Sequence, residues 1–152
     1  MSLLEDVDAL IGRRHLLTHP FYTKWVAGTL PKEAIQEYAR QYYAFESNFP
    51  RFLSAIHSRC EDPKVRQAIL ENLWDEEHGP NNHRELWLQF AEGVGVDRDD
   101  VIGADRNSAA EGLVETYREA CDDPSAGLAA IYAYERQVPA VAGAKIGGLA
   151  AN

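Results

Sequence analysis

The stretch PKVRQAILENLWDEEHGPNNHRELWLQFAEGV, residues 63–94, decides the fold class of this chain. Its apolar residues recur every three or four positions, which is the period of an α-helix that buries one face. If the stretch is one helix that turns by about 100° per residue, its main apolar residues fall within about 60° of Glu76. His83 falls on the same stripe. The Gly79-Pro80 pair is a helix breaker that can interrupt the stretch.

The rest of the chain carries helix signals too, and no alternation of period two persists. Ser2 and Glu5 form a capping box before a first helix, and Ser108 and Glu111 form another before a later one. We expect helices over residues 3–17, 21–28, 31–60, 63–78, 81–92, 108–121 and 124–149, with a loop over 93–107. The sequence therefore predicts an all-α fold in a single domain over residues 1–152.

Composition and charge exclude several classes of protein. The chain has 152 residues, 45% of them hydrophobic, and a net charge of −9, which disfavours nucleic-acid and anionic-membrane partners. No run approaches the roughly 18 apolar residues of a membrane span. The N-terminus carries acids where a signal peptide carries bases. We therefore expect a cytoplasmic protein that binds neither nucleic acid nor membrane.

Three glutamates lie on the apolar stripes of predicted helices: Glu46, Glu76 and Glu135. A carboxylate in such a place is costly unless it is paired, protonated or bound to metal. A single case is better explained by an arginine partner or by a position at the edge of the stripe. Three cases on three helices, with His83 beside one of them, indicate a non-haem iron site, because helical domains build such sites by projecting Glu and His inward.

Each of these glutamates stands four residues before a proline. The pairs are Glu46 and Pro50, Glu76 and Pro80, and Glu135 and Pro139. Proline at this spacing removes the hydrogen bond to the glutamate's own carbonyl and bends the helix. We predict that the bends widen the space beside each acid and leave room for a pocket. Coincidence in a glutamate-rich chain is the alternative.

Four segments of the chain resemble a known superfamily of helical proteins. They are HPFYTKW (19–25), YYAFESNFPRFLSAIHSRC (42–60), LWDEEHGPNNHRELWLQFAEGVG (73–95) and LAAIYAYERQVPAVAGAKIGGL (128–149). They resemble the haem-oxygenase-like superfamily (TenA/PqqC-like), and are closest to the CADD-like group, named after the chlamydial protein associating with death domains. The resemblance implies a helical bundle around a central pocket, assembled as a homodimer, that acts on a small-molecule substrate.

The resemblance also implies roles for individual residues. The metal-binding members are oxidases or oxygenases with two irons, and Glu76 and His83 match the family's Glu-x6-His positions. Glu135 matches its next carboxylate. Apart from the resemblance, the place of Glu46 on an apolar stripe makes it a candidate for a position behind the ligands. The CADD-like group is linked to para-aminobenzoate for folate, with a tyrosine and a lysine near the metals, and Tyr22 and Lys145 stand at the matching places.

The chain departs from the family pattern at its C-terminal end. A further helix of the family supplies two histidines and an aspartate, whereas this chain stops at GGLAAN. We therefore expect a bundle that lacks the family's C-terminal helices and holds about half of a two-iron ligand set.

Other candidate residues are better explained without a functional site. Asp75 and His78 have ferritin-like spacing but face away from the apolar stripe, which indicates a solvated surface. An isolated histidine near a helix end usually caps carbonyls, so His15 and the neighbouring His19 are poor haem ligands. Cys60 and Cys121 match neither a zinc nor a redox spacing, nor the thiaminase nucleophile.

Three hypotheses about function follow. The first is an iron-dependent, di-iron type oxidoreductase, in which Glu76, His83 and Glu135 bind metal and Tyr22 and Lys145 lie near the substrate or serve as one. The second is a metal-free enzyme of cofactor synthesis, like the pyrroloquinoline-quinone synthases. The third is a non-catalytic protein that binds a partner through surface left exposed by the missing helices.

Overall fold

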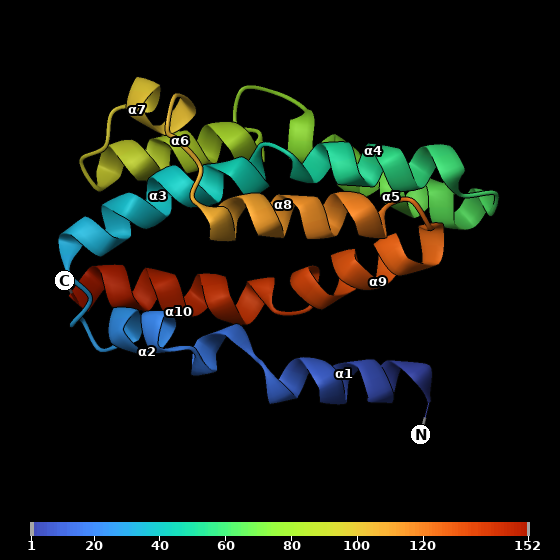
Figure 1. The fold of residues 1–152 in the computed structure, drawn as a ribbon, viewed down its shortest axis with the longest axis horizontal. Coiled ribbons are helices and arrows are strands. Elements are labelled where there is room, and N and C mark those ends of the chain that lie inside the picture. Colours follow the sequence, from blue (N-terminus) through green and yellow to red (C-terminus); the bar gives the residue numbers. More distant parts are fainter. Residues whose placement is uncertain (1, 152) are drawn as a thin grey trace. The chain divides into compact units, whose positions relative to one another are not determined.

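The computed structural model describes residues 2–151, and none of these residues forms a strand (Figure 1). The predicted all-α class is confirmed. The helices form two compact units. Unit 1 contains the residues up to Pro31 and those from Ala129 onward, and unit 2 contains Lys32–Leu128.

Unit 1 brings together the two ends of the sequence. Its elements are α1 (Leu3–Arg13), the 3₁₀ turn η1 (Leu16–Thr18), α2 (Pro20–Val26), the C-terminal part of α9 (Pro124–Glu135) and α10 (Val138–Ala151). Helix α2 packs against α10. The predicted capping box at the start of α1 is confirmed, because the Ser2 and Glu5 side chains each bond the other's backbone N–H.

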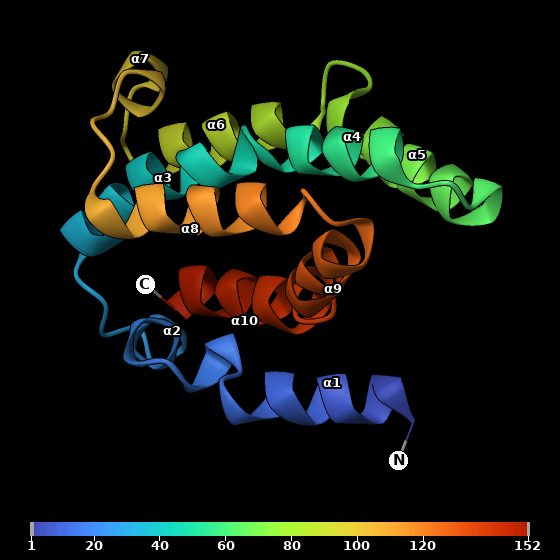
Figure 2. The same cartoon turned by 45° about the vertical axis from the view of Figure 1, so that its right-hand side comes forward.

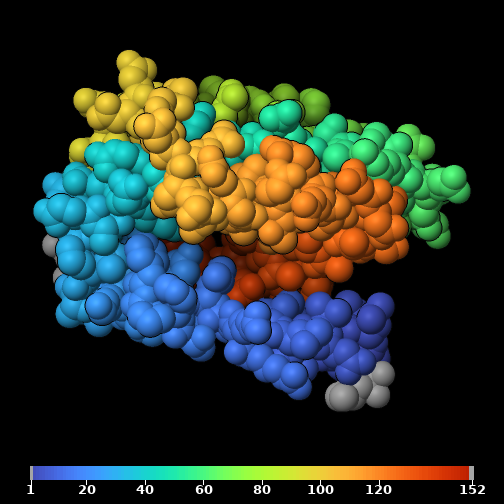
Figure 3. Space-filling view, viewed as in Figure 1, coloured from blue at the N-terminus to red at the C-terminus, as the bar shows by residue number. Residues whose placement is uncertain are grey.

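Unit 2 is built around α3. Its elements are α3 (Lys32–Glu46), α4 (Phe49–Arg59), α5 (Pro63–Glu77), α6 (His83–Gly93), α7 (Arg98–Ile102), α8 (Ser108–Ala120) and the first residues of α9. Helix α3 packs against α6, α7 and α8, while α4 packs along α5 (Figure 2). Helix α8 lies at the surface of this unit, where Val114 is its one fully buried residue (Figure 3).

The core of unit 2 centres on Trp87 of α6. Its indole Nε1 donates a hydrogen bond to the carbonyl oxygen of Ala39 at 2.9 Å, which ties α6 to α3. The rings of Tyr38 and Tyr42 pack against the same indole at 5.4 and 4.7 Å between centroids. The tyrosines of α3 therefore serve as core residues, as is usual for large amphipathic side chains with an apolar ring.

The two predicted long helices, 31–60 and 124–149, are each interrupted near a proline, and the helices predicted over 63–78 and 81–92 are separate, as expected. Residues 31–60 form α3 and α4, residues 63–94 form α5 and α6, and residues 124–149 form α9 and α10. Helices α3 and α9 end at Glu46 and Glu135, and α5 ends one residue after Glu76. The helices therefore stop beside the glutamates, where continuous but bent helices were predicted.

Three local predictions were wrong. Helix α8 is capped by Asn107, whose side chain accepts the Ala110 N–H, rather than by Ser108. The predicted loop 93–107 contains the short helix α7, which Asp97 precedes in extended conformation. The first helix also ends at Arg13, four residues earlier than predicted.

No helix among the described residues combines the length and the apolar character needed to cross a bilayer.

Candidate metal centre

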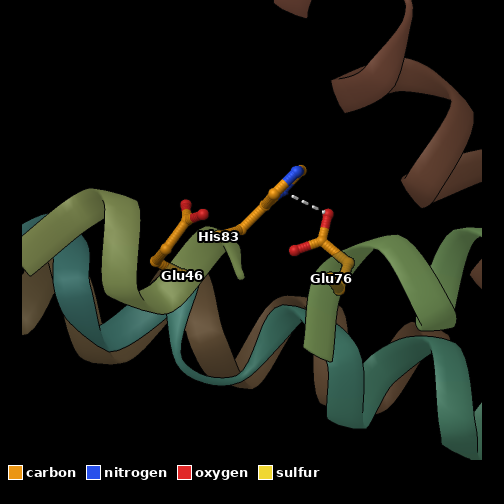
Figure 4. A group of neighbouring side chains, drawn as sticks. All are labelled: Glu46, Glu76 and His83. Atoms are coloured by element: carbon orange, nitrogen blue, oxygen red, sulfur yellow. Dashed lines mark ion pairs between the residues drawn. The ribbon is translucent and has the colours of Figure 1, made fainter. Parts of the chain in front are cut away.

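Three side chains of metal-binding type meet in unit 2: Glu46, Glu76 and His83. One ligand atom from each lies within 4.8 Å of the other two. The closest pair is His83 Nδ1 and Glu76 Oε1, at 2.9 Å. Figure 4 shows the three side chains projecting to the same side of the ribbon, with the imidazole directed at the Glu76 carboxylate.

All three residues stand at helix ends. Glu46 is the last residue of α3, Glu76 is the last but one of α5, and His83 is the first of α6. Helix ends change direction within a few residues, so side chains from different helices can converge there. The site is therefore a product of the interruptions in the predicted helices.

The turn between α5 and α6 brings Glu76 and His83 together. Residues seven apart in one continuous helix are separated by about 10.5 Å along the axis. The observed 2.9 Å between their side chains therefore requires the break, and the continuous-helix geometry of residues 63–94 was wrong. Gly79 makes the break with a φ of 81°, which is in the left-handed region that favours glycine.

Asn82 fixes the start of α6 directly before His83. Its side-chain oxygen accepts the Glu85 N–H at 3.0 Å, and its Nδ2 donates to the Gly79 carbonyl at 3.0 Å. The asparagine thereby satisfies one of the unpaired N–H groups of a helix N-terminus and closes the turn. Both bonds restrict where the His83 side chain leaves the backbone.

Asn48 plays the corresponding part after Glu46. It is 5% exposed, and its Nδ2 donates to the Ala44 carbonyl at 2.7 Å. Its Oδ1 accepts a hydrogen bond from Arg51 at 3.2 Å. The side chain satisfies the Ala44 carbonyl, which lacks its helical partner because the Asn48 N–H donates to the Phe45 carbonyl instead.

The three candidate ligands differ strongly in exposure. Glu76 is 5% exposed, while the His83 side chain is 48% exposed and Glu46 is intermediate. A cavity of about 50 Å³ adjoins the glutamates. It is lined by Glu46, Ser47, Pro50, Glu76, Glu77, Asn82 and Arg84. The predicted pocket beside Glu46 and Glu76 is therefore present, and it is large enough for an ion or a water molecule rather than for an organic substrate.

An ion pair between Arg98 and Glu85 stabilises the first turn of α6, which follows His83. Arg98 of α7 bonds Glu85, and also Glu92 at 3.2 Å. The bond to Arg98, with a further hydrogen bond from Gln89, lowers the pKa of the Glu85 carboxyl. The same bond raises the pKa of Arg98. Glu85 is therefore ionised and engaged with Arg98.

The donor set is of a kind that could hold a metal ion. Two carboxylates and an imidazole are ligands that iron accepts, and open positions would remain for small molecules. Ligand atoms about 2.1 Å from one metal at right angles lie about 3 Å apart. The 2.9 Å between His83 and Glu76 matches that spacing. Glu46, expected behind the ligands, lies among the three residues within coordinating range.

The other predicted site residues belong to unit 1. Glu135 ends α9 and is half-buried. Tyr22 of α2 is buried, and Lys145 of α10 is half-buried with its Nζ over the ring of Trp25. Metal binding by Glu135 and the part played by Tyr22 and Lys145 stay predictions.

The residues for which the sequence analysis expected no functional site lie largely as predicted. Asp75 and His78 are exposed, and His78 stacks on Trp74 at 3.9 Å. His15 and His19 do cap helix ends, but through Nδ1 atoms that accept N–H groups at the start of η1 and α2, whereas capping of carbonyls was expected.

Two features of the site escaped the sequence analysis. Asn82 has a recognisable signal, since an asparagine three residues before a glutamate is a common helix start. Arg84 lines the cavity, and nothing in its sequence surroundings distinguishes it from other exposed arginines.

Comparison with known proteins gives the chain its family. The model of the TENA/THI-4/PQQC family matches residues 5–151. The chain is 46% identical over 151 residues to the 4-aminobenzoate synthase of Chlamydia muridarum, covering 98% of this chain and 64% of that protein. It is 43% identical over 157 residues to the 4-aminobenzoate synthase of Nitrosomonas europaea, covering 96% and 64%. The pyrroloquinoline-quinone synthase of Acinetobacter baumannii is 32% identical over 93 residues, which are 60% of this chain and 37% of that protein.

The chain thus spans just under two thirds of the length of these two aminobenzoate synthases. Its match to the family model nevertheless extends from the first helix to the last. The chain belongs to the TENA/THI-4/PQQC family.

Proposed function

We propose that the protein is an iron-dependent oxidoreductase that takes part in the formation of 4-aminobenzoate, a precursor of folate. The observation that carries the proposal is the convergence of Glu46, Glu76 and His83 at three helix ends. The names of the relatives in Chlamydia muridarum and Nitrosomonas europaea support the product. A small-molecule substrate and a homodimer, as in the resemblance, complete the proposal.

The three residues have different tasks in this proposal. Buried Glu76 supplies a negative charge whose desolvation a cation would offset. His83 supplies a neutral nitrogen, and its exposed edge leaves the site open to solvent and small molecules. Glu46 adds a second carboxylate from the end of α3. Iron held in such a site supplies activation of O₂.

In the proposal, residues of unit 1 interact with the organic substrate. Tyr22 and Lys145 lie near the substrate or serve as one, and Glu135 is a further metal ligand. Tyr22 is held by its neighbour Phe21 at 5.2 Å between ring centroids and is almost fully buried, so its ring has a defined orientation.

Metal analysis tests the proposal directly. The protein is purified without chelator, and iron per chain and iron affinity (by titration) are measured in wild type and in Glu76→Ala, His83→Ala and Glu46→Ala. We expect iron affinity to fall by at least about tenfold in each, because each loses a coordinating group. Asp75→Ala and His78→Ala are controls, since they remove a carboxylate and an imidazole from exposed positions nearby.

Iron content that stays the same in Glu76→Ala and His83→Ala would contradict the iron site. Production of 4-aminobenzoate is then measured by mass spectrometry in a bacterial strain that requires the compound. Product without iron would favour the metal-free hypothesis, which the similarity to the pyrroloquinoline-quinone synthase supports over 60% of the chain. Neither iron nor product would favour the partner-binding hypothesis.

A further inference from the structure

Trp25 of α2 is completely buried within unit 1. Its side chain is 0% exposed, and its ring meets that of Phe21 at 5.7 Å between centroids. A buried indole needs a partner for its N–H, because an unpaired donor away from water is costly. The identity of that partner is informative.

The partner is Lys145 of α10. Trp25 Nε1 donates a hydrogen bond to the Lys145 carbonyl oxygen at 3.1 Å. The same indole lies under the Lys145 side chain, with Nζ 5.4 Å from the ring centroid. The Trp25 side chain therefore contacts Lys145 twice, at its backbone carbonyl and at its ammonium group.

These two contacts restrict the lysine in different ways. The hydrogen bond fixes the position of the backbone at residue 145 relative to the indole. An ammonium group within about 6 Å of a tryptophan centroid is attracted to the ring face. Since a lysine stem has many rotamers, the ring selects those that place the ammonium above it.

Helix α10 is shaped to admit the indole. A Cβ at Gly148 would lie 2.6 Å from the Trp25 carbonyl oxygen and would also collide with the Trp25 ring. Gly148 stands three residues after Lys145, on the same face of the helix. The adjacent Gly147 has nothing within 4 Å of such a Cβ. The lack of a side chain at Gly148 therefore lets Trp25 come close to the face of α10 that carries Lys145.

We propose that Trp25 is a positioning residue that holds the Lys145 ammonium in one orientation. The proposal rests on the proposed function for its chemical purpose, since an amine that reacts or binds substrate must be held near the reacting atom. The competing explanation is that Lys145 runs past the ring into solvent without a fixed place, as lysines at helix surfaces do.

Nuclear magnetic resonance of the full 152-residue chain, labelled with ¹³C-lysine, tests the geometry. The chain's lysines are Lys24, Lys32, Lys64 and Lys145, and Lys145→Arg assigns the signal of interest. We expect the ε-methylene protons of Lys145 to lie upfield of the other three and to show cross-relaxation with the Trp25 indole. We expect the upfield shift to be reduced in Trp25→Phe and lost in Trp25→Leu.

The wild-type spectrum alone can overturn the proposal. If the Lys145 ε-methylene signal coincides with those of exposed lysines and shows no cross-relaxation with an indole, the ammonium is not held. This readout needs no variant, so it stands even if Trp25→Leu fails to fold. Gly148→Ala should reduce the shift by displacing the ring, and Gly147→Ala should leave it unchanged.

An activity measurement separates this proposal from the proposed function. In cells, 4-aminobenzoate production should fall in the order wild type, Trp25→Phe, Trp25→Leu, with Gly147→Ala equal to wild type. Equal production in all four would overturn the positioning role. Absence of product in wild type would instead contradict the proposed function, while the resonance of Lys145 would still decide whether Trp25 holds the ammonium.

Discussion

Glu76 stands apart from the other acids of the chain by burial rather than by residue type. The sequence has 24 aspartates and glutamates, and among the described residues Glu76 is the acid with a fully buried side chain. A buried carboxylate is stable only with partners, and His83 supplies one at 2.9 Å. The apolar spacing around Glu76 in the sequence therefore correctly predicted that its side chain is buried.

The two cysteines offer a test at the same scale. Burial raises the pKa of the Cys121 thiol, which is 2% exposed, whereas Cys60 is half-exposed. The raised pKa means that Cys121 stays a neutral thiol at a pH at which a free cysteine begins to ionise, and the thiolate is the reactive form. With iodoacetamide at pH 8, we expect Cys60 to be alkylated at least about tenfold faster than Cys121.

Peptide mass spectrometry gives the two rates separately, and denatured protein, in which both sites should react alike, is the control. Equal rates in the folded protein would contradict the packing of Cys121 in unit 2.

At the scale of the element, helix ends decide where the chemistry lies. The candidate ligands come from the ends of three helices: Glu46, Glu76 and His83. A different local feature stabilises the chain at each end. These features are the Asn48 side chain after α3, the left-handed Gly79 after α5 and the Asn82 cap before α6.

Gly79→Ala tests the turn between α5 and α6. A φ of 81° is strained for alanine, although no atom lies within 4 Å of the added Cβ, so we expect a loss of about 1 kcal/mol in the free energy of unfolding. We also expect weaker iron binding, because the Glu76–His83 approach depends on this turn. Urea denaturation and metal titration measure the two effects.

Gly112→Ala is the matched control, since this helical glycine also has an open Cβ position and lacks the positive φ. Iron affinity equal in Gly79→Ala and wild type would show that the turn does not control the site.

The sequence predicted the helices well and their ends less well. Apolar period and capping residues located α1, α2, α5 and α6, because these signals act within a few residues. The same period cannot tell a continuous helix from two helices that share a stripe, so residues 31–60 were joined wrongly. Glu46 stands at that break, which explains why its side chain comes within 4.8 Å of those of Glu76 and His83. Arg84 has no sequence signal, since its place depends only on where the turn 78–82 leads.

At the scale of the whole molecule, the chain divides into two units of unequal core. Unit 2 contains most of the buried apolar residues, including Phe45, Leu53 and Ile56, whereas helix α1 of unit 1 buries none of its residues fully. Local stability follows buried apolar contact, so regions without it open at low cost.

Hydrogen exchange followed by mass spectrometry checks this difference. We expect amides of α1 to exchange at least about a hundredfold faster than those of α3, because α3 lies at the centre of unit 2. Equal protection of α1 and α3 would contradict the division. Peptides from α8, which has one buried residue, should exchange at an intermediate rate.

The meeting of three helix ends has a consequence for heat stability. An ion bound by Glu46, Glu76 and His83 would act as a cross-link between α3, α5 and α6 that exists only in the folded chain. By mass action, a ligand at a hundred times its dissociation constant stabilises the fold by about 2.7 kcal/mol. The melting temperature of unit 2 would then rise with iron concentration and would itself become a gauge of occupancy.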